Sequence, residues 1–300
     1  MKIKGPATKN QKYLAILLAV IMVFSVSAMF FAKSLKTGSD NDFSTQAVEN
    51  KSSTIPFSQI PGKHVHHQFN SILDGLNVSP KGVMIAIYID LLKSKGTPLE
   101  TLSENRILKD FYGADVTKCY LAKYVNGSMF ELNQVPKQEI LVPWGFVPYH
   151  EYYILLKTNK TYDMLSVVGN PVISGSPQSV KDVIDIIEKN KISTQDYDQI
   201  LSQAEPKDAI IEKVATKSNV MNIPAEQYYI DLKKLDNGSY TQTLIFLNPE
   251  PKVTKNIAAL KANSNERGVT YNLTNSGNIT KLKMSSDFAS LNNETKLLSL

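Results

Sequence analysis

Residues 13–32, YLAILLAVIMVFSVSAMFFA, decide how the rest of the chain is read. The stretch has twenty residues and no charged side chain. Because an α-helix rises ~1.5 Å per residue, twenty residues span about 30 Å, which matches the hydrocarbon core of a bilayer. Four lysines precede the stretch, and this bias places the N-terminus in the cytoplasm. We therefore predict a single-pass transmembrane signal anchor, with the rest of the chain outside the cell.

The same residues also contain the parts of a cleaved signal peptide. A basic start precedes the apolar run, and the small residues around Ala28 suit a signal peptidase. The length of the run favours the anchor, because the apolar region of a secretory signal usually has about 7–15 residues. Both interpretations predict that the main body is exported.

The positive charge of the chain is concentrated beside this segment. The whole chain has 33 basic and 28 acidic residues, a formal net charge of +5. Six of the basic residues are lysines in residues 1–36, which contain no acidic residue. This leaves 27 basic against 28 acidic side chains in residues 37–300. With only two arginines in the chain as well, nucleic-acid binding is not expected.

Local signals in the exported part predict both strands and helices. Residues 83–91 (VMIAIYIDL) form an apolar, β-branched run that is typical of a buried strand. Thr97, followed by proline and by Glu100, has the pattern of a helix start. The pair Asn126-Gly127 predicts a tight hairpin between two flanking strands.

Further along the chain, Ser176 and Pro177 open a second predicted helix whose apolar residues recur at helical spacing. The prolines of residues 135–150 predict a loop, and the polar residues beyond Phe288 predict a frayed tail.

These signals predict an α+β fold in which an N-terminal transmembrane helix precedes two mixed α+β units. The second unit has the element order of a ferredoxin-like split βαβ. The predicted parts are a cytoplasmic stub (1–12), the transmembrane signal anchor (13–32), a flexible tether (33–56), a first α+β unit (57–164), a second α+β unit (165–290) and a tail (291–300).

Three of the four histidines fall within residues 64–67. On an extended segment His64 and His66 point to the same side, as paired imidazole ligands of zinc do. His150 is a candidate for a third ligand, with Asp74 and Asp90 as acidic alternatives. A solvated surface strand explains the same pattern without a metal, and a zinc site needs three or four defined ligands.

Residues 142–153, VPWGFVPYHEYY, are rich in aromatic and proline residues. Rigid aromatic side chains of this kind often anchor protein partners or line sugar-binding surfaces. Packing of the same side chains over the core is the alternative. The candidate interaction residues are Trp144, Phe146, Tyr149, Tyr152 and Tyr153.

Asn-X-Ser/Thr sequons are frequent and matter only on an exported chain. The candidate glycosylation sites are Asn77, Asn126, Asn159, Asn237, Asn272 and Asn278.

No catalytic motif stands out in the sequence. The chain has no P-loop, no G-x-G-x-x-G, no H-E-x-x-H and no G-x-S-x-G pattern. Carboxylate pairs such as Asp182 and Asp185 are expected on solvated helix faces. The single cysteine, Cys119, excludes an intramolecular disulfide and is expected to be a buried thiol.

Several phrases carry a resemblance to a known group of proteins. They are QIPGKHVHHQFNSILDGL (59–76), GTPLE (96–100), YGADVTK (112–118) and NERGVTYNLT (265–274). The chain resembles membrane-anchored, exported proteins of methanogenic archaea. The resemblance implies an archaeal cell envelope and carries no activity or site residue with it.

The sequence therefore predicts a membrane-anchored extracellular binding or structural module that contacts an envelope protein or glycan, without catalysis. A zinc-dependent enzyme or metal-handling protein centred on His64 and His66 is the first alternative. An assembly factor for exported proteins is the second.

Overall fold

The computed structural model describes residues 54–102, 112–143, 145–156, 165–221 and 223–298. All of these residues belong to one compact unit, Lys51–Leu300. The predicted transmembrane segment 13–32, with its flanks, lies outside the described residues. Among the residues that are described, none of the helices has the length and apolar character of a bilayer-spanning helix.

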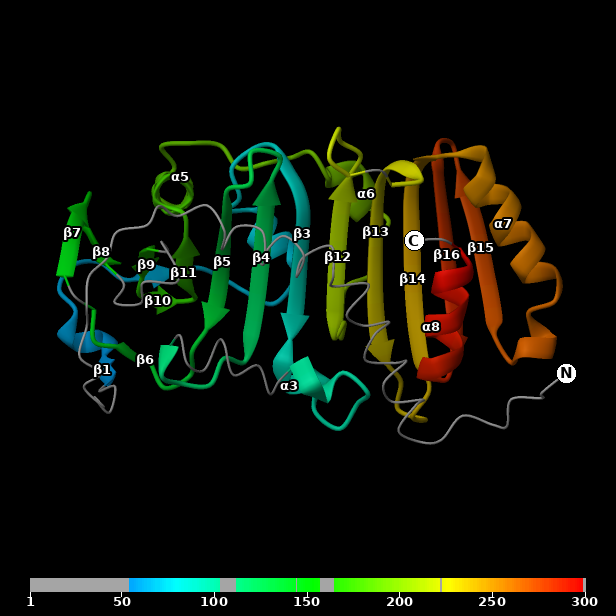
Figure 1. Ribbon diagram of the computed structural model, residues 1–300, viewed down its shortest axis with the longest axis horizontal. Coiled ribbons are helices and arrows are strands. Elements are labelled where there is room, and N and C mark those ends of the chain that lie inside the picture. The colour runs from blue at the N-terminus through cyan, green and yellow to red at the C-terminus, as the bar shows by residue number, and fades with distance from the viewer. Residues whose placement is uncertain (1–53, 103–111, 144, 157–164, 222, 299–300) are drawn as a thin grey trace, which may run out of the picture. The chain divides into compact units, whose positions relative to one another are not determined.

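Within the described residues, twelve strands form one sheet in which every neighbouring pair is antiparallel (Figure 1). In spatial order the strands are β15 (Thr270–Ser276), β16 (Ile279–Ser286), β14 (Tyr240–Pro249), β13 (Ala225–Lys234), β12 (Ile211–Thr216), β3 (Val83–Asp90), β4 (Lys118–Tyr124), β5 (Met129–Gln134), β11 (Val172–Gly175), β9 (Leu165–Val167), β8 (Tyr152–Leu156) and β7 (Gly145–Tyr149). Two small pairs complete the strands, β1 (Thr54–Pro56) with β6 (Glu139–Leu141) and β2 (Val65–His66) with β10 (Gly169–Asn170).

The prediction of two α+β units is wrong, because the strands of both halves join in this single sheet. The junction is the antiparallel pair β3–β12, which runs in register from Ile85↔Ala215 to Ile89↔Ile211. The predicted boundary at residue 164 also falls inside the sheet, since β9 and β11 pair with β8 and β5. A pairing between strands more than a hundred residues apart has no local signature in the sequence.

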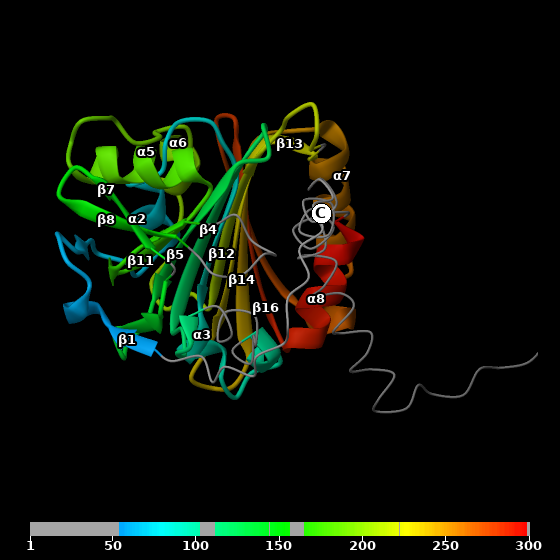
Figure 2. The same ribbon diagram turned by 60° about the vertical axis from the view of Figure 1, so that its left-hand side comes forward.

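Helices cover both faces of the sheet (Figure 2). On one side, the α5 face, lie α2 (Ile72–Leu76), α5 (Pro177–Ile187) and α6 (Asp198–Leu201). On the other side, the α8 face, lie α7 (Pro251–Ala262) and α8 (Phe288–Leu297). Short elements complete the list: α3 (Leu91–Ser94) and the 3-10 turns Phe57–Gln59, Glu100–Leu102 and Asn265–Arg267.

The core of the α5 face explains why these helices form where they do. Val180, Val183 and Ile184 of α5 are fully buried, as their helical spacing predicts, and they pack in one cluster with Tyr120 and Phe130 of the sheet. The predicted strand β3 and the hairpin β4–β5 around Asn126-Gly127 are confirmed as well. Where a helix is predicted after Thr97, the structure describes the 3-10 turn Glu100–Leu102, and residues 103–111 lie outside the described residues.

Three local predictions are wrong. The predicted loop 135–150 contains β6 and β7, and the end of the predicted tether is β1. The predicted frayed tail is helix α8, which Asp287 opens by accepting the backbone N–H groups of Ala289 and Ser290. In each case tertiary packing stabilises a segment whose own composition is too polar or too rich in proline to predict it.

A buried polar cluster lies beside the β3–β12 junction on the α5 face. Glu212 of β12 and Asp231 of β13 stand opposite each other in register, and both are 1 % exposed. The Tyr229 hydroxyl lies 3.2 Å from Glu212 Oε2 and 3.2 Å from Asp231 Oδ2. Glu212 also accepts the Ile72 N–H of α2 at 3.1 Å. Burial raises the pKa of Glu212 to about 8 and raises the pKa of Asp231 in the same direction.

Candidate interaction site

The β7–β8 hairpin ends the sheet and presents apolar side chains to the outside. Phe146 is 40 % exposed and Val147 is 42 % exposed, and they point to opposite sides of β7 because successive residues alternate along a strand. Val142, just before β7, is exposed as well. Phe146 stacks edge-on against Tyr153 of β8, with ring centroids 6.2 Å apart. We call Val142, Phe146, Val147 and Tyr153 the hairpin surface; its side chains extend around the β7 edge to both faces of the sheet and do not lie on one face.

Helix α5 fixes the turn of this hairpin through one carboxylate. The Tyr149 hydroxyl donates to Asp185 Oδ1 at 2.8 Å, and His150 Nε2 lies 3.1 Å from the same oxygen. Lys191 approaches the second oxygen of Asp185 at 3.0 Å. Burial opposes the charged form of Asp185, but the hydrogen bonds from Lys191, Tyr149 and His150 outweigh it and hold its pKa below the usual value.

A second carboxylate, that of the α5 C-cap residue Glu188, holds the start of β8. Tyr152 is buried, and its hydroxyl donates to Glu188 Oε1 at 2.6 Å. Lys63 reaches the same oxygen at 2.5 Å and also lies over the Tyr152 ring, 5.4 Å from its centroid. The hydrogen bonds from Lys63 and Tyr152 lower the pKa of Glu188. The hairpin is therefore fastened to α5 by charge-assisted hydrogen bonds at both sides of its turn.

The outer edge of β7 is blocked for strand addition. The Lys63 N–H donates to the backbone oxygen of Glu151, which therefore faces away from β7. Because backbone groups alternate in direction along a strand, the N–H and C=O groups of Tyr152 and Ile154 face β7. They pair with the backbone groups of Tyr149 and Val147. The backbone groups of Phe146 and Pro148 therefore face away from β8, at the outer edge of the sheet. Since proline has no N–H, this edge lacks a donor where an added strand would need one.

The structure thus brings together most of the predicted aromatic residues, in two different roles. Tyr149 and Tyr152 bind α5, whereas Phe146 and Tyr153 form the outward hairpin surface. Trp144 lies outside the described residues. The core-packing alternative therefore holds for Tyr149 and Tyr152, whereas an interface role of Phe146 and Tyr153 stays a prediction.

Sequence reasoning missed the acidic residues that hold the site. The prediction that Asp185 lies on a solvated helix face is wrong, since Asp185 is buried and accepts three side chains. Glu188 lies one turn further along the helix and was not predicted to take part. The available signal was the spacing of these two carboxylates on α5, but their aromatic partners come from strands that are distant in the sequence.

The predicted metal ligands do not converge. His64 Nε2 lies 3.0 Å from Ile60 O, His66 is exposed on β2, and His150 binds Asp185. Among the described residues, three or more His, Cys, Asp or Glu side chains nowhere gather in a metal-binding arrangement. Of the acidic alternatives, Asp90 caps α3 and Asp74 accepts the Asn70 N–H. The zinc site stays a prediction without a geometric basis in these residues.

The sequons occupy turns and strands of different exposure. Asn126 and Asn237 sit in hairpin turns, and each accepts the hydroxyl of the sequon serine, Ser128 or Ser239, at 2.7 Å. Asn77, Asn272 and Asn278 are also exposed. Asn159 lies outside the described residues. The glycosylation of these sites stays a prediction.

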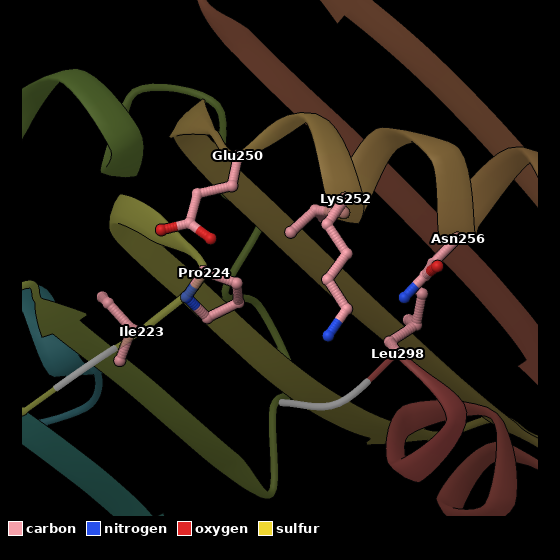
Figure 3. Close-up of a pocket in the computed structure, with 7 residues that line it drawn as sticks. Ile223, Pro224, Glu250, Lys252, Asn256 and Leu298 are labelled. Atoms are coloured by element: carbon pink, nitrogen blue, oxygen red, sulfur yellow. The ribbon is translucent and has the colours of Figure 1, made fainter.

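A small pocket lies apart from the hairpin, beside the first turn of α7 (Figure 3). Its volume is about 180 Å³, which is small for a drug-sized ligand. Glu250, at its rim, is paired with Lys217 at 2.6 Å. Its lining residues are Ile223, Pro224, Glu250, Lys252, Val253, Asn256 and Leu298. The mixed lining gives no set of polar groups that converge on one ligand.

Comparison with known proteins finds a family similarity within the described unit. Residues 68–188 match the AF_2048_N model, which is described as a family N-terminal domain. No curated protein and no solved structure matches the chain. The matched residues run from just before α2 to just after α5, so they contain β7, β8, Asp185 and Glu188. The hairpin surface therefore lies within the part of the chain that is similar to this family's N-terminal domain.

Proposed function

We propose that this protein is a non-catalytic binding module of the cell envelope, and that a partner protein docks on the hairpin surface. The observation that carries the proposal is the exposure of Phe146 and Val147 on a strand whose hairpin is fastened to α5. An exposed group of apolar side chains in a monomeric protein commonly marks a binding surface.

The fastening favours binding because it reduces the entropy lost on association. Tyr149 and Tyr152 fix the turn through Asp185 and Glu188, so the exposed side chains are held before a partner arrives. Preorganisation of this kind strengthens binding without additional contacts. Aromatic side chains such as Phe146 are typical centres of protein interfaces.

The blocked edge defines how the partner binds. Because Pro148 removes a donor from the outer edge of β7, the partner is expected to contact side chains and not to add a strand. The partner's complementary surface would then be apolar, with polar groups at its rim that meet Lys181 and Lys191 of the α5 side.

The location of the module follows from the sequence. Residues 13–32 are proposed to anchor the chain in the cell membrane with the N-terminus in the cytoplasm, and the described unit would then face outward. The sequons support an exported module.

The proposal is tested with the double variant Phe146→Ser/Val147→Ser in the full chain. We expect the partner that co-purifies with the wild type to be lost, while the free energy of unfolding falls by no more than about 3 kcal/mol, because each side chain is only partly buried. Leu92→Ser is the matched control, since Leu92 is 52 % exposed on α3 and lies outside the hairpin surface. Retention of the partner by the double variant, or a large loss of stability, would contradict the proposal.

A further inference from the structure

The second edge of the sheet, β15, differs from β7 in that neither its own sequence nor its ladder contains a feature that blocks strand addition. Its seven residues, TYNLTNS, contain no proline, no lysine and no other charged residue. Its ladder with β16 is regular from Thr270↔Ser285 to Ser276↔Ile279, without a bulge. Natural proteins usually protect an edge strand by one of these means.

The backbone groups that face outward can be assigned from the ladder. The Asn248 N–H donates to Asn278 O, so even-numbered residues of β16 turn towards β14 and odd-numbered ones towards β15. The odd-numbered residues Ile279, Lys281 and Lys283 pair with Ser276, Thr274 and Asn272. The backbone N–H and C=O groups of Tyr271, Leu273 and Asn275 therefore face away from the sheet. In the described part of the chain, no strand pairs with this side of β15.

A network on the α8 face holds β15 in place. Glu294 of α8 is 2 % exposed and accepts Arg267 Nε at 2.5 Å, together with the Tyr271 hydroxyl. Arg267 also donates to Asn263 O at 3.0 Å and to Leu260 O at 2.5 Å at the end of α7. The edge is therefore ordered before any partner binds, which lowers the cost of pairing.

We propose that β15 pairs with β15 of a second copy of this chain in an antiparallel, two-fold symmetric arrangement. A two-fold axis at Leu273 places Leu273 opposite its own counterpart and Tyr271 opposite Asn275 of the second copy. All three outward residues of each copy then exchange N–H and C=O bonds across the junction. The twelve-stranded sheets of the two copies would then continue as one sheet through the dimer.

The side chains at this junction suit self-pairing. Asn272 and Thr274 would face Thr274 and Asn272 of the second copy, which are uncharged pairs that can hydrogen-bond. The nearest lysine rows, at Lys281 and Lys283 of β16, would be three strand spacings apart, roughly 14 Å, a distance at which physiological salt screens their repulsion. An interface made by one strand pair is small, so a weak, concentration-dependent dimer is expected.

This inference goes beyond the proposed function and uses the opposite end of the sheet. In the dimer each copy keeps its own β7 edge at the far end, so the hairpin surface stays accessible in both copies. The dimer would therefore be bivalent for its partner.

The first test is the oligomeric state of the detergent-solubilised full chain, measured by sedimentation velocity over a range of concentrations. Leu273→Pro removes an outward N–H that β16 does not use, and we expect its dimer dissociation constant to rise at least ~10-fold, since hydrogen bonds are lost on both copies. Leu273→Lys, which places like charges opposite each other, should have a similar effect that weakens at high salt. Asn272→Gln also removes the Asn272 sequon, as Leu273→Pro does, but keeps the backbone and an amide that can face Thr274, so it should dimerise nearly as the wild type does.

The second test identifies the register by disulfide cross-linking in a Cys119→Ala background. Leu273→Cys should cross-link to itself on oxidation, because Cα atoms about 5.5 Å apart across a hydrogen-bonded pair suit a disulfide. Asn275→Cys should not, because it would lie roughly 13 Å from its counterpart. A wild-type chain that stays monomeric at high concentration would overturn the proposal, as would a dimer that persists unchanged in Leu273→Pro or equal cross-linking of both cysteine variants.

Discussion

Replacing Glu212 by Gln should remove most of the pH dependence of stability between pH 5 and 8. Glu212 is 1 % exposed, and burial raises its pKa from 4.5 to about 8. Between these two values the folded protein keeps a proton that the unfolded chain has lost. The free energy of unfolding therefore falls as the pH rises through this window. The contribution of Glu212 to stability is greatest below pH 4.5 and is lost by about pH 8.

The size of this effect follows from the difference between the two pKa values. At 1.36 kcal/mol for each pH unit, a rise from 4.5 to about 8 corresponds to about 5 kcal/mol. Asp231 contributes in the same direction, because burial raises its pKa too. The carboxylates with lowered pKa values, such as Asp185 and Glu294, are ionised in both states above pH 5 and add little to this window.

The assay is denaturant unfolding of the wild type and of Glu212→Gln at pH 5.5, 7 and 9. Glutamine has the same shape and keeps an oxygen for the Ile72 N–H, so the variant should stay folded and lose most of the slope. Glu226→Gln, at an exposed position of the neighbouring strand β13, should keep the wild-type slope. Equal slopes in Glu212→Gln and in the wild type would refute the reasoning.

Two further predictions concern the networks that hold the two edges of the sheet. Arg267→Met leaves the buried Glu294 without its charge partner and should lower the free energy of unfolding by about 3–5 kcal/mol, as measured by chemical denaturation. Lys217→Met breaks an exposed ion pair and should lower it by less than about 1 kcal/mol in the same assay. Tyr152→Phe removes a hydrogen bond to the carboxylate of Glu188 and should lower the free energy of unfolding by about 1.5–3 kcal/mol. Hydrogen exchange of the backbone amides should become faster in β7 and β8 only. Unchanged exchange in these strands would show that the bond does not fasten the hairpin.

The elements that could be predicted are those whose signals are local. The β-branched run of β3, the Asn126-Gly127 turn and the spacing of Val180, Val183 and Ile184 in α5 each specify one element from a few neighbouring residues. Ser176 shows the limit of such signals. It occupies the predicted N-cap position of α5, but its hydroxyl donates to Ser179 Oγ and does not cap the helix.

The long-range features could not be predicted in this way. The merger of both halves depends on β3 pairing with β12, and no residue near either strand specifies that partner. The interaction site was predicted as an aromatic segment, but its support by Asp185 and Glu188 depends on the packing of α5 on β8. The carboxylates Glu212 and Asp231 lie in strands that also carry other polar and charged residues, so their burial had no local signature in the sequence.

Site-specific photo-cross-linking in intact cells tests most directly whether the hairpin surface binds a protein partner. A photoreactive amino acid at position 147 should give one dominant cross-linked protein, whereas the same group at position 92 should not, although Val147 and Leu92 are both exposed apolar side chains. The cross-link from position 147 should disappear when Phe146 is also replaced by Ser. The absence of any cross-link at 147, or the same product from both positions, would contradict the claim.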